Sequence, residues 1–249
     1  MKQLEGKVAV VTGGNSGIGF AMASRFAAEG AAVVIVGRRA DAVDAAVKQL
    51  GEKAVGVTGD IADLATHDRV AALVAARFGG ADIYVANAGM NQITPSEHVG
   101  VEEYDVQFAT NTRAVFFGVQ KMAPLLRANG SILLVSSIAS GKALDGHAVY
   151  AGSKAAIEAF ARSWALEFKA RGIRVNVISP GPVDTPILAK LGVAETERAG
   201  FEAMMAGAIP LGRLGRPGEV ANAAFLLASP EGSFITGVNL RVDGGIALA

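Results

Sequence analysis

Tyr150 and Lys154 stand four residues apart in a segment with helical spacing, so the phenol and the ammonium would lie on one face of a helix. A phenol with a pKa near ~10 is a poor base at neutral pH, but a neighbouring cation stabilises the phenolate. Ser137 closes the preceding strand-like segment, thirteen residues before the tyrosine. These groups could pass a proton to or from a substrate. By itself, a tyrosine and lysine at this spacing is more often a surface pair.

A glycine-rich turn joins the first strand-like run to the helical segment that follows it. The turn reads Thr12-Gly-Gly-Asn-Ser-Gly-Ile-Gly19. Residues without a Cβ permit a tight turn and let backbone N–H groups approach a pyrophosphate, which the helix dipole also attracts. Three glycines alone are weak support for a nucleotide-binding turn, because a structural turn without a ligand can have the same pattern. The candidate cofactor-binding residues here are Gly13, Asn15, Ser16, Gly17, Ile18 and Gly19.

The end of the second strand predicts which nicotinamide cofactor would bind. An NAD enzyme places an acidic residue there to bind the ribose 2'-hydroxyl. This chain instead reads Gly37-Arg-Arg39, so no carboxylate is available, and Arg38 and Arg39 can donate bidentate hydrogen bonds to a 2'-phosphate. NADP is therefore favoured, although one or both arginines could be solvated loop residues.

Two further segments follow the third and fourth predicted strands. Asp60-Ile61 could meet the adenine amino group, and Asn87-Ala88-Gly89 could hold the main chain or the ribose. The carboxyl ends of parallel strands form the edge at which open α/β sheets bind nucleotides. The alternative is that Asp60 or Asn87 serves only as a turn residue or helix N-cap.

Apolar runs and helical segments alternate along the whole chain. Short β-branched runs bounded by turns predict strands buried on both faces, and parallel strands need helical crossovers between them. We therefore predict one α/β domain over residues 1–249, a doubly wound Rossmann-type fold with a mostly parallel seven-stranded sheet, and a substrate lid around 182–216. The predicted strands are 7–12, 32–36, 54–58, 83–86, 131–135, 174–178 and 237–242, and the predicted helices are 18–29, 41–50, 64–78, 101–126, 149–170 and 217–227.

Composition excludes several classes of protein. Lys plus Arg and Asp plus Glu both number 23, and no basic run offers a surface for nucleic acid or anionic lipid. There is no cysteine and no metal-binding motif, so no metal site is predicted. No apolar run is long enough for a membrane span and no signal peptide is evident. We expect a cytoplasmic enzyme without nucleic-acid or membrane partners.

Taken together, these motifs resemble those of the short-chain dehydrogenase/reductase family over nearly the whole chain. The resemblance rests on the glycine loop, on Asn87–Gly89, Ser137, Tyr150 and Lys154, on Pro180-Gly181, and on Val242–Gly245. It implies that Ser137 orients a substrate carbonyl, that Tyr150 exchanges the proton, and that Lys154 lowers the tyrosine pKa and binds the nicotinamide ribose. Asn111 matches the fourth member of the set and would hold a water that relays protons to Lys154, which its side-chain amide can do as donor and acceptor.

The segment after the sixth strand completes the implied cofactor site. It reads Pro180-Gly-Pro-Val-Asp-Thr185. By resemblance, main-chain groups at Val183 and the hydroxyl of Thr185 hold the nicotinamide carboxamide, and the pro-S hydride is transferred. Pro180 and Gly181 belong to the same set.

The expected function is reversible hydride transfer between NADP(H) and a small carbonyl or alcohol, as in a ketone or aldehyde reductase or a secondary alcohol dehydrogenase. A 3-oxoacyl carrier-protein reductase, a sugar or steroid dehydrogenase, and a non-catalytic NADP-binding regulator are alternatives. The substrate would meet Asn91, residues 138–147 and residues 186–205. An apolar pocket from Leu144, Leu188, Leu191, Met204 and Met205 is as plausible as an ordinary core role for these residues.

The resemblance also implies a homotetramer that pairs the segments 112–126 and 149–170 across subunits. Both segments carry more apolar positions than one sheet-facing stripe requires, although all of them could lie in the core of the monomer. The apolar positions are Val115, Phe116, Val119, Met122, Ile157, Phe160, Trp164 and Phe168.

Overall fold

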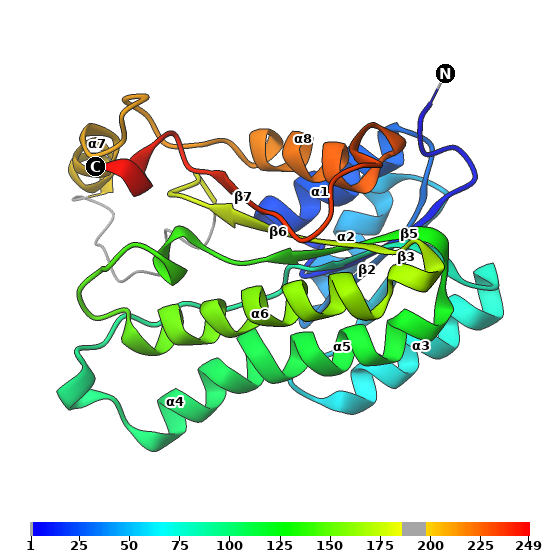
Figure 1. Ribbon diagram of the computed structural model, residues 1–249, viewed down its shortest axis with the longest axis horizontal. Coiled ribbons are helices and arrows are strands. Elements are labelled where there is room, and N and C mark those ends of the chain that lie inside the picture. The colour runs from blue at the N-terminus through cyan, green and yellow to red at the C-terminus, as the bar shows by residue number, and fades with distance from the viewer. Residues whose placement is uncertain (1, 186–197) are drawn as a thin grey trace.

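A computed structural model describes residues 2–185 and 198–249 and contains one seven-stranded sheet (Figure 1). The strands lie in the order β3-β2-β1-β4-β5-β6-β7, and every neighbouring pair is parallel. This confirms the predicted single α/β domain with a doubly wound sheet. The strands are β1 Val8–Thr12, β2 Ala32–Gly37, β3 Ala54–Thr58, β4 Ala81–Ala86, β5 Leu126–Val135, β6 Arg174–Pro180 and β7 Asn239–Val242.

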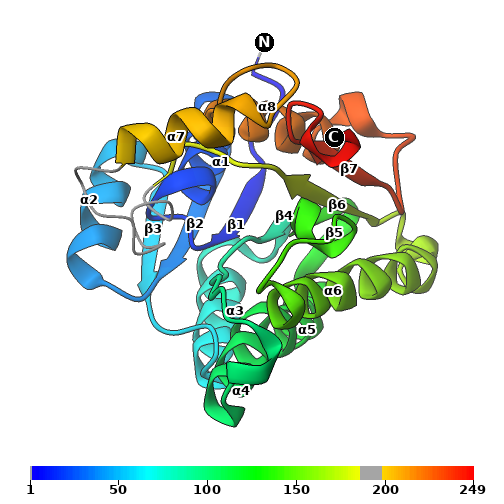
Figure 2. The ribbon, with the colours of Figure 1, turned by 90° about the vertical axis from the view of Figure 1, so that its left-hand side faces the viewer.

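Helices cover both faces of this sheet, as its fully buried central strands require. Figure 2 shows α1 and α8 over one face and α3, α5 and α6 over the other. Each face holds its own apolar core, built largely from alternate strand residues. The helices are α1 Gly17–Ala28, α2 Ala40–Leu50, α3 Leu64–Phe78, α4 Val101–Phe108, α5 Ala114–Met122, α6 Ala148–Glu167, α7 Arg198–Gly207 and α8 Pro217–Ala228.

The predicted helical stretch over 101–126 is helical as far as Leu125, but it is not one continuous α-helix. After α4 the chain forms a π-helical turn over Ala109–Arg113, then α5, and then a 3-10 turn over Ala123–Leu125. Pro124 lies in the first positions of that 3-10 turn, where it stops the helix because it has no N–H for a helical bond. The strand β5 therefore starts at Leu126, five residues before the predicted start.

The segment 182–216 contains a helix that the sequence did not predict. Helix α7 occupies Arg198–Gly207, and Figure 1 shows it at the same end of the molecule as the C-terminus. Scattered glycine and methionine residues obscure its helical period in the sequence. Residues 186–197, including Leu188 and Leu191 of the predicted pocket, lie outside the described part of the chain.

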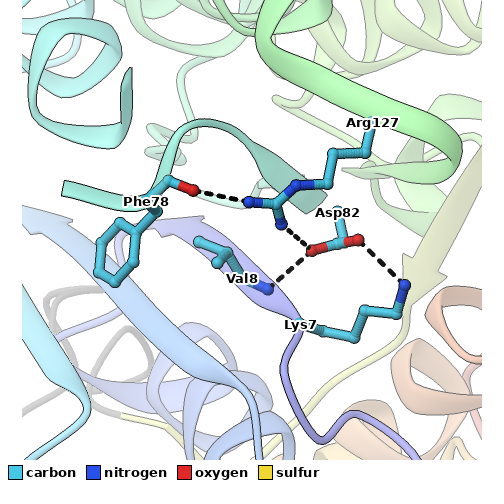
Figure 3. Close-up of polar contacts among 5 residues, drawn as sticks. All are labelled: Lys7, Val8, Phe78, Asp82 and Arg127. Atoms are coloured by element: carbon cyan, nitrogen blue, oxygen red, sulfur yellow. Dashed lines mark hydrogen bonds and ion pairs between the residues drawn. The ribbon is translucent and has the colours of Figure 1, made fainter. Parts of the chain in front are cut away.

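A buried carboxylate fastens the amino-terminal edge of the sheet (Figure 3). Asp82 on β4 is 7% exposed and accepts hydrogen bonds from Val8 N at 2.9 Å, Lys7 Nζ at 3.1 Å and Arg127 Nη1 at 2.6 Å. The same guanidinium donates to Phe78 O at 2.6 Å. Three central strands are thus joined at the edge opposite the one where the glycine loop lies, so we assign this cluster to stability.

The described residues contain neither a membrane-spanning helix nor a metal-binding cluster. No helix within 2–185 or 198–249 is long and apolar enough to cross a membrane. No group of three His, Asp or Glu side chains in these ranges lies close enough together to hold a metal ion.

Candidate active site

Parallel strands bring segments that are far apart in sequence to one edge of the sheet. Because all seven strands point the same way, every loop that leaves a carboxyl end emerges on that edge. Figure 2 views the molecule from this end. The segments gathered there follow successive strands and begin at Gly13, Arg38, Gly59, Asn87, Ser136 and Gly181.

The glycine loop is packed too closely for side chains. Gly13 and Gly17 adopt positive φ values of 65° and 53°, which disfavour residues with a Cβ. A Cβ at Gly19 would overlap Gly13 O and Asn87 Nδ2. The N-cap residue of α1, Ser16, makes no side-chain cap hydrogen bond, and the first turn has no acidic residue. The helix therefore presents uncapped N–H groups and its positive end to a ligand.

Thr12 and Asn87 tie the glycine loop to the end of β4. Thr12 Oγ1 accepts hydrogen bonds from Asn87 N at 3.0 Å and Ala88 N at 3.1 Å and donates to Val85 O at 3.3 Å. Asn87 Nδ2 donates to Thr12 O at 2.9 Å. The side chain of Asn87 thus holds the main chain of the glycine loop, and a contact with the ribose stays a prediction. The role of Thr12 was not predicted. The signal that could have indicated it is the position of Thr12 at the end of β1, directly before the glycine loop.

The end of β2 leaves Arg38 and Arg39 free to meet an anion. Both are exposed, and Arg39 is the N-cap residue of α2. Asn15 lies against Gly37, and a Cβ at Gly37 would overlap Asn15 Oδ1. Only glycine fits this position. Asp60 accepts a hydrogen bond from Ala62 N at 2.9 Å, so at least one of its oxygens serves the turn. The two exposed guanidiniums are therefore accessible to an anion at this edge of the sheet.

The candidate proton-transfer groups converge at the start of α6. Tyr150 and Lys154 share one helical face, with Lys154 Nζ 5.9 Å from the centre of the tyrosine ring. Ser137 follows β5, and its hydroxyl faces the phenol of Tyr150 closely enough to lower the pKa of that phenol. Lys154 is 4% exposed, and its Nζ donates to Val135 O at 2.8 Å. Ser137, Tyr150 and Lys154 therefore form one cluster, in which Lys154 is buried and the other two residues are partly buried.

The two adjacent serines face different surroundings, as alternation along a strand requires. Ser137 contacts Tyr150, and its Oγ also accepts from Ala139 N at 3.2 Å. Ser136 Oγ instead donates to Glu158 Oε1 at 2.7 Å. The structure thus directs Ser137, and not Ser136, toward the tyrosine.

Burial dominates the electrostatics of this cluster. It raises the pKa of Tyr150, and the hydrogen bond to Ser137 opposes that rise. It lowers the pKa of Lys154 from 10.5 to about 8. The net pKa shift of Tyr150 is upward because desolvation of the phenol is the largest effect, and the lowering of this pKa by Lys154 stays a prediction. A positive charge beside Tyr150 would favour its phenolate.

Asn111 lies in the π-helical turn between α4 and α5 and is fully buried. Its Oδ1 accepts from Met90 N at 2.9 Å, and its Nδ2 donates to Met90 O at 2.9 Å and Ser153 Oγ at 3.1 Å. These bonds use both N–H groups of the amide and one lone pair of Oδ1, so the relay water expected at Asn111 stays a prediction. The amide positions the segment after Gly89 against α6.

The loop after β6 is fixed by short contacts with its neighbours. Gly181 N donates to Val242 O at 3.0 Å, and a Cβ at Gly181 would lie 2.8 Å from Asp243 Cα. Val183 is buried and forms a β-bridge with Gly215, and Thr185 Oγ1 donates to Val183 O at 3.3 Å. Pro180 ends β6, so the predicted carboxamide-binding segment begins at the site edge.

Three segments meet around the predicted substrate position. Thr94 N donates to Gly146 O at 2.9 Å, which joins the loop after β4 to the loop before α6. Lys142 Nζ donates to Ile246 O at 2.9 Å and to Ala249 O, which joins that loop to the end of the chain. These links were not predicted, because they connect residues far apart in sequence. Met204 and Leu144 are exposed and are free to face a ligand.

The site residues fit a dinucleotide. The loop presents uncapped helix N–H groups beside positions where any Cβ would collide, as a close-lying pyrophosphate requires. A Cβ at Gly89 would lie 3.1 Å from Asn111 Oδ1 and 3.2 Å from Lys154 Nζ, so this glycine keeps the lysine accessible from the loop side. The buried ammonium of Lys154 suits a ribose hydroxyl as acceptor.

The apolar positions proposed for subunit contacts divide between core and surface. Val115, Val119, Met122, Ile157 and Trp164 are buried within the single chain, which is the alternative considered above. Phe116 is 37% exposed and stacks edge-on with Phe160, which is partly buried. The case for oligomers from these helices therefore rests on fewer residues than the sequence suggested.

The fold and the site define a class: a nucleotide-binding α/β oxidoreductase with a tyrosine as its candidate proton donor. A family model described as Enoyl-(Acyl carrier protein) reductase matches residues 13–247. The chain is 43% identical over 249 residues to Oxidoreductase asL5 of Sarocladium schorii, covering 99% of this chain and 98% of that protein. It is 38% identical over 248 residues to 2,5-dichloro-2,5-cyclohexadiene-1,4-diol dehydrogenase LinX of Sphingobium indicum, covering 98% and 97%.

Solved structures agree with these sequence relatives. A glucose/ribitol-type short-chain dehydrogenase/reductase from Brucella melitensis is 32% identical, superposes with a TM-score of 0.91, and covers 99% of each chain. The chain therefore belongs to the short-chain dehydrogenase/reductase family, and it is an oxidoreductase of the kind that uses a nicotinamide cofactor.

Proposed function

We propose that this protein is an NADPH-dependent reductase of ketones or aldehydes, or equivalently a secondary alcohol dehydrogenase. The observation that carries the proposal is the cluster of Ser137, Tyr150 and Lys154 at the carboxyl edge of the sheet, beside the glycine loop. A partly buried phenol that interacts with a serine hydroxyl and has an ammonium on the same helical face suits proton transfer to an oxygen. A non-catalytic regulator would not need this arrangement.

The cofactor supplies the hydride, and the protein supplies the proton. In reduction, Ser137 and the phenol of Tyr150 donate hydrogen bonds to the carbonyl oxygen of the substrate. As the carbon gains the hydride, the phenol proton passes to that oxygen, so the products are an alcohol and a tyrosinate. The tyrosinate regains a proton from solvent. Lys154, the nearest cation along the helix face, stabilises the tyrosinate while it exists.

The residues at the end of β2 support a preference for NADPH over NADH. Gly37 offers no acid to a ribose 2'-hydroxyl, and the exposed Arg38 and Arg39 offer charged donors to a 2'-phosphate. Residues of the glycine loop with Asp60, Ile61, Asn87, Ala88 and Gly89 would hold the adenosine and pyrophosphate. Pro180, Gly181, Val183 and Thr185 would lie against the nicotinamide.

The substrate class is a small secondary alcohol or its ketone. The diol substrate in the name of LinX and the sugar-alcohol substrate in the name of the Brucella structure support an alcohol of this kind. The acyl carrier protein in the description of the family model keeps a 3-oxoacyl carrier-protein reductase as the alternative. A lid over 182–216, a homotetramer and a cytoplasmic location stay predictions.

Cofactor oxidation tests the function directly. The purified protein is mixed with NADPH or NADH and with aliphatic, aromatic and cyclic ketones, and with an acetoacetyl thioester, and the absorbance at about 340 nm is followed. We expect turnover of a free ketone with NADPH. Turnover confined to the thioester favours the alternative, and tight NADPH binding without turnover of any compound would contradict the proposed function.

A further inference from the structure

Glu158 connects the helix that carries Tyr150 to the turn that carries Ser137. Its Oε1 accepts a hydrogen bond from Ser136 Oγ at 2.7 Å and from Ser140 Oγ at 2.5 Å. Glu158 follows Tyr150 by two helical turns and Lys154 by one, so the three side chains lie along one face of α6. A single carboxylate oxygen therefore gathers hydroxyls from both sides of Ser137.

The other acceptors near the Ser136 and Ser140 hydroxyls are weaker or more distant than Glu158. Ser136 Oγ lies 3.3 Å from its other acceptor, Lys154 O, against 2.7 Å from Glu158. Ser140 Oγ lies 2.7 Å from Ser137 O, and a carboxylate attracts a hydroxyl proton more strongly than a neutral carbonyl does. Ser179 Oγ also faces Glu158, at 3.5 Å, but its shorter contact is with Asn239. Glu158 is thus the main acceptor for Ser136 and Ser140.

The charge of Glu158 has no salt-bridge partner in the part of the chain that the structure describes. A partly buried carboxylate without a cation is stabilised here by hydroxyl donors. A carboxylate only accepts hydrogen bonds, so Glu158 can accept one from each serine hydroxyl without having to donate one. An ordinary surface glutamate on α6, such as the exposed Glu167, makes no comparable contact.

We propose that Glu158 is a positioning residue that fixes Ser137 relative to Tyr150. Residues 138–140 form a 3-10 turn that is capped by Ser137, so a displacement at Ser136 or Ser140 moves the Ser137 hydroxyl. A displacement of about an ångström at reacting groups can cost up to about a hundredfold in rate. The inference rests on the proposed reductase function, but the position of the turn can be measured without any substrate.

The kinetic test compares Glu158→Ala with Glu158→Gln, which keeps the accepting oxygen, and with Glu167→Ala as the control on the same helix. With the best ketone from the panel, Glu158→Ala should lower kcat about ten- to a hundredfold and leave the KM for NADPH nearly unchanged. Glu158→Gln should recover most of the rate, and Glu167→Ala should retain all of it. Adding Ser140→Ala to Glu158→Ala should cost little more, because both changes break one link.

Hydrogen exchange supplies the second measurement. In Glu158→Ala, peptides covering 136–142 should exchange faster than in the unaltered protein, in Glu158→Gln or in Glu167→Ala. Unchanged exchange in Glu158→Ala, or a kcat within twofold of the unaltered enzyme, would overturn the inference. If the unaltered protein reduces no ketone, the proposed function fails, and exchange alone then decides whether Glu158 fixes the turn.

Discussion

Replacement of Lys154 by methionine should make the protein more stable while it removes activity. Lys154 is 4% exposed, and burial lowers the pKa of its ammonium from 10.5 to about 8. The folded protein therefore disfavours a charge that it keeps beside Tyr150. Methionine has a similar length and no charge, so it fills the same space without the desolvation cost.

The magnitude follows from the two pKa values. A fall from 10.5 to about 8 corresponds to about 3 kcal/mol that the charged lysine costs the folded state. The variant also loses the hydrogen bond from Nζ to Val135 O, worth about 1 kcal/mol, so the expected net gain near neutral pH is about 2 kcal/mol.

The gain should depend on pH. Below pH 8 the lysine is protonated in both states, and the full cost applies. Between pH 8 and 10.5 the unfolded chain binds the proton that the folded protein has released, so the stability of the unaltered protein rises with pH. Above 10.5 the cost is gone, and the advantage of Lys154→Met disappears with it.

Urea denaturation of both proteins, at the same protein concentration, measures this difference in the free energy of unfolding. At about pH 6.5 Lys154→Met should unfold with about 2 kcal/mol more free energy than the unaltered protein, and at about pH 9.5 the two should be nearly equal. Lys48→Met, at an exposed position on α2, is the control and should show no such pH dependence. A variant that is no more stable at pH 6.5, or a gain that is independent of pH, would refute the reasoning.

Two further substitutions test the separate roles of the two edges of the sheet. Asp82→Ala removes the acceptor of the buried Val8 N–H and should lower the free energy of unfolding by about 2 to 4 kcal/mol, since Lys7 and Arg127 are exposed enough to hydrate. Urea titration measures the loss, and a kcat reduced in the folded fraction would contradict a purely stabilising role. Arg38→Asp should lower NADPH affinity about ten- to a hundredfold, or about 1.5 to 3 kcal/mol, and leave NADH affinity unchanged or improved. Fluorescence titration measures both constants, and equal affinity of the unaltered protein for the two cofactors would contradict the assignment of Arg38.

Local pattern was enough to predict the strands, the glycine loop and the face shared by Tyr150 and Lys154. Each depends on residues within a few positions of one another, such as the β-branched run before Gly13. The parallel direction of the strands followed from their alternation with helices, but their order in the sheet was not predicted. The choice of Ser137 over Ser136 came from the family resemblance, because alternation alone says only that one of them faces away.

Contacts between distant segments could not be predicted. The amide of Asn111 is bonded to Met90, twenty-one positions away, so its availability to water could not be judged from its residue type. The direction of the Tyr150 pKa shift depends on how deeply the ring is buried, which helical spacing does not give. Glu158 looked like any polar residue on a long helix until β5 and α6 were placed beside each other.

The proton donor assigned to Tyr150 is tested most directly by Tyr150→Phe. The phenylalanine ring fills the same space but has no hydroxyl to pass a proton, and a positioned proton donor is worth roughly 10² to 10⁴ in rate. Steady-state reduction of the best ketone should therefore show kcat lowered by at least about a hundredfold, with the Kd for NADPH nearly unchanged. A Tyr150→Phe enzyme that works within threefold of the original rate would contradict the account, and the proton would have to come from another group.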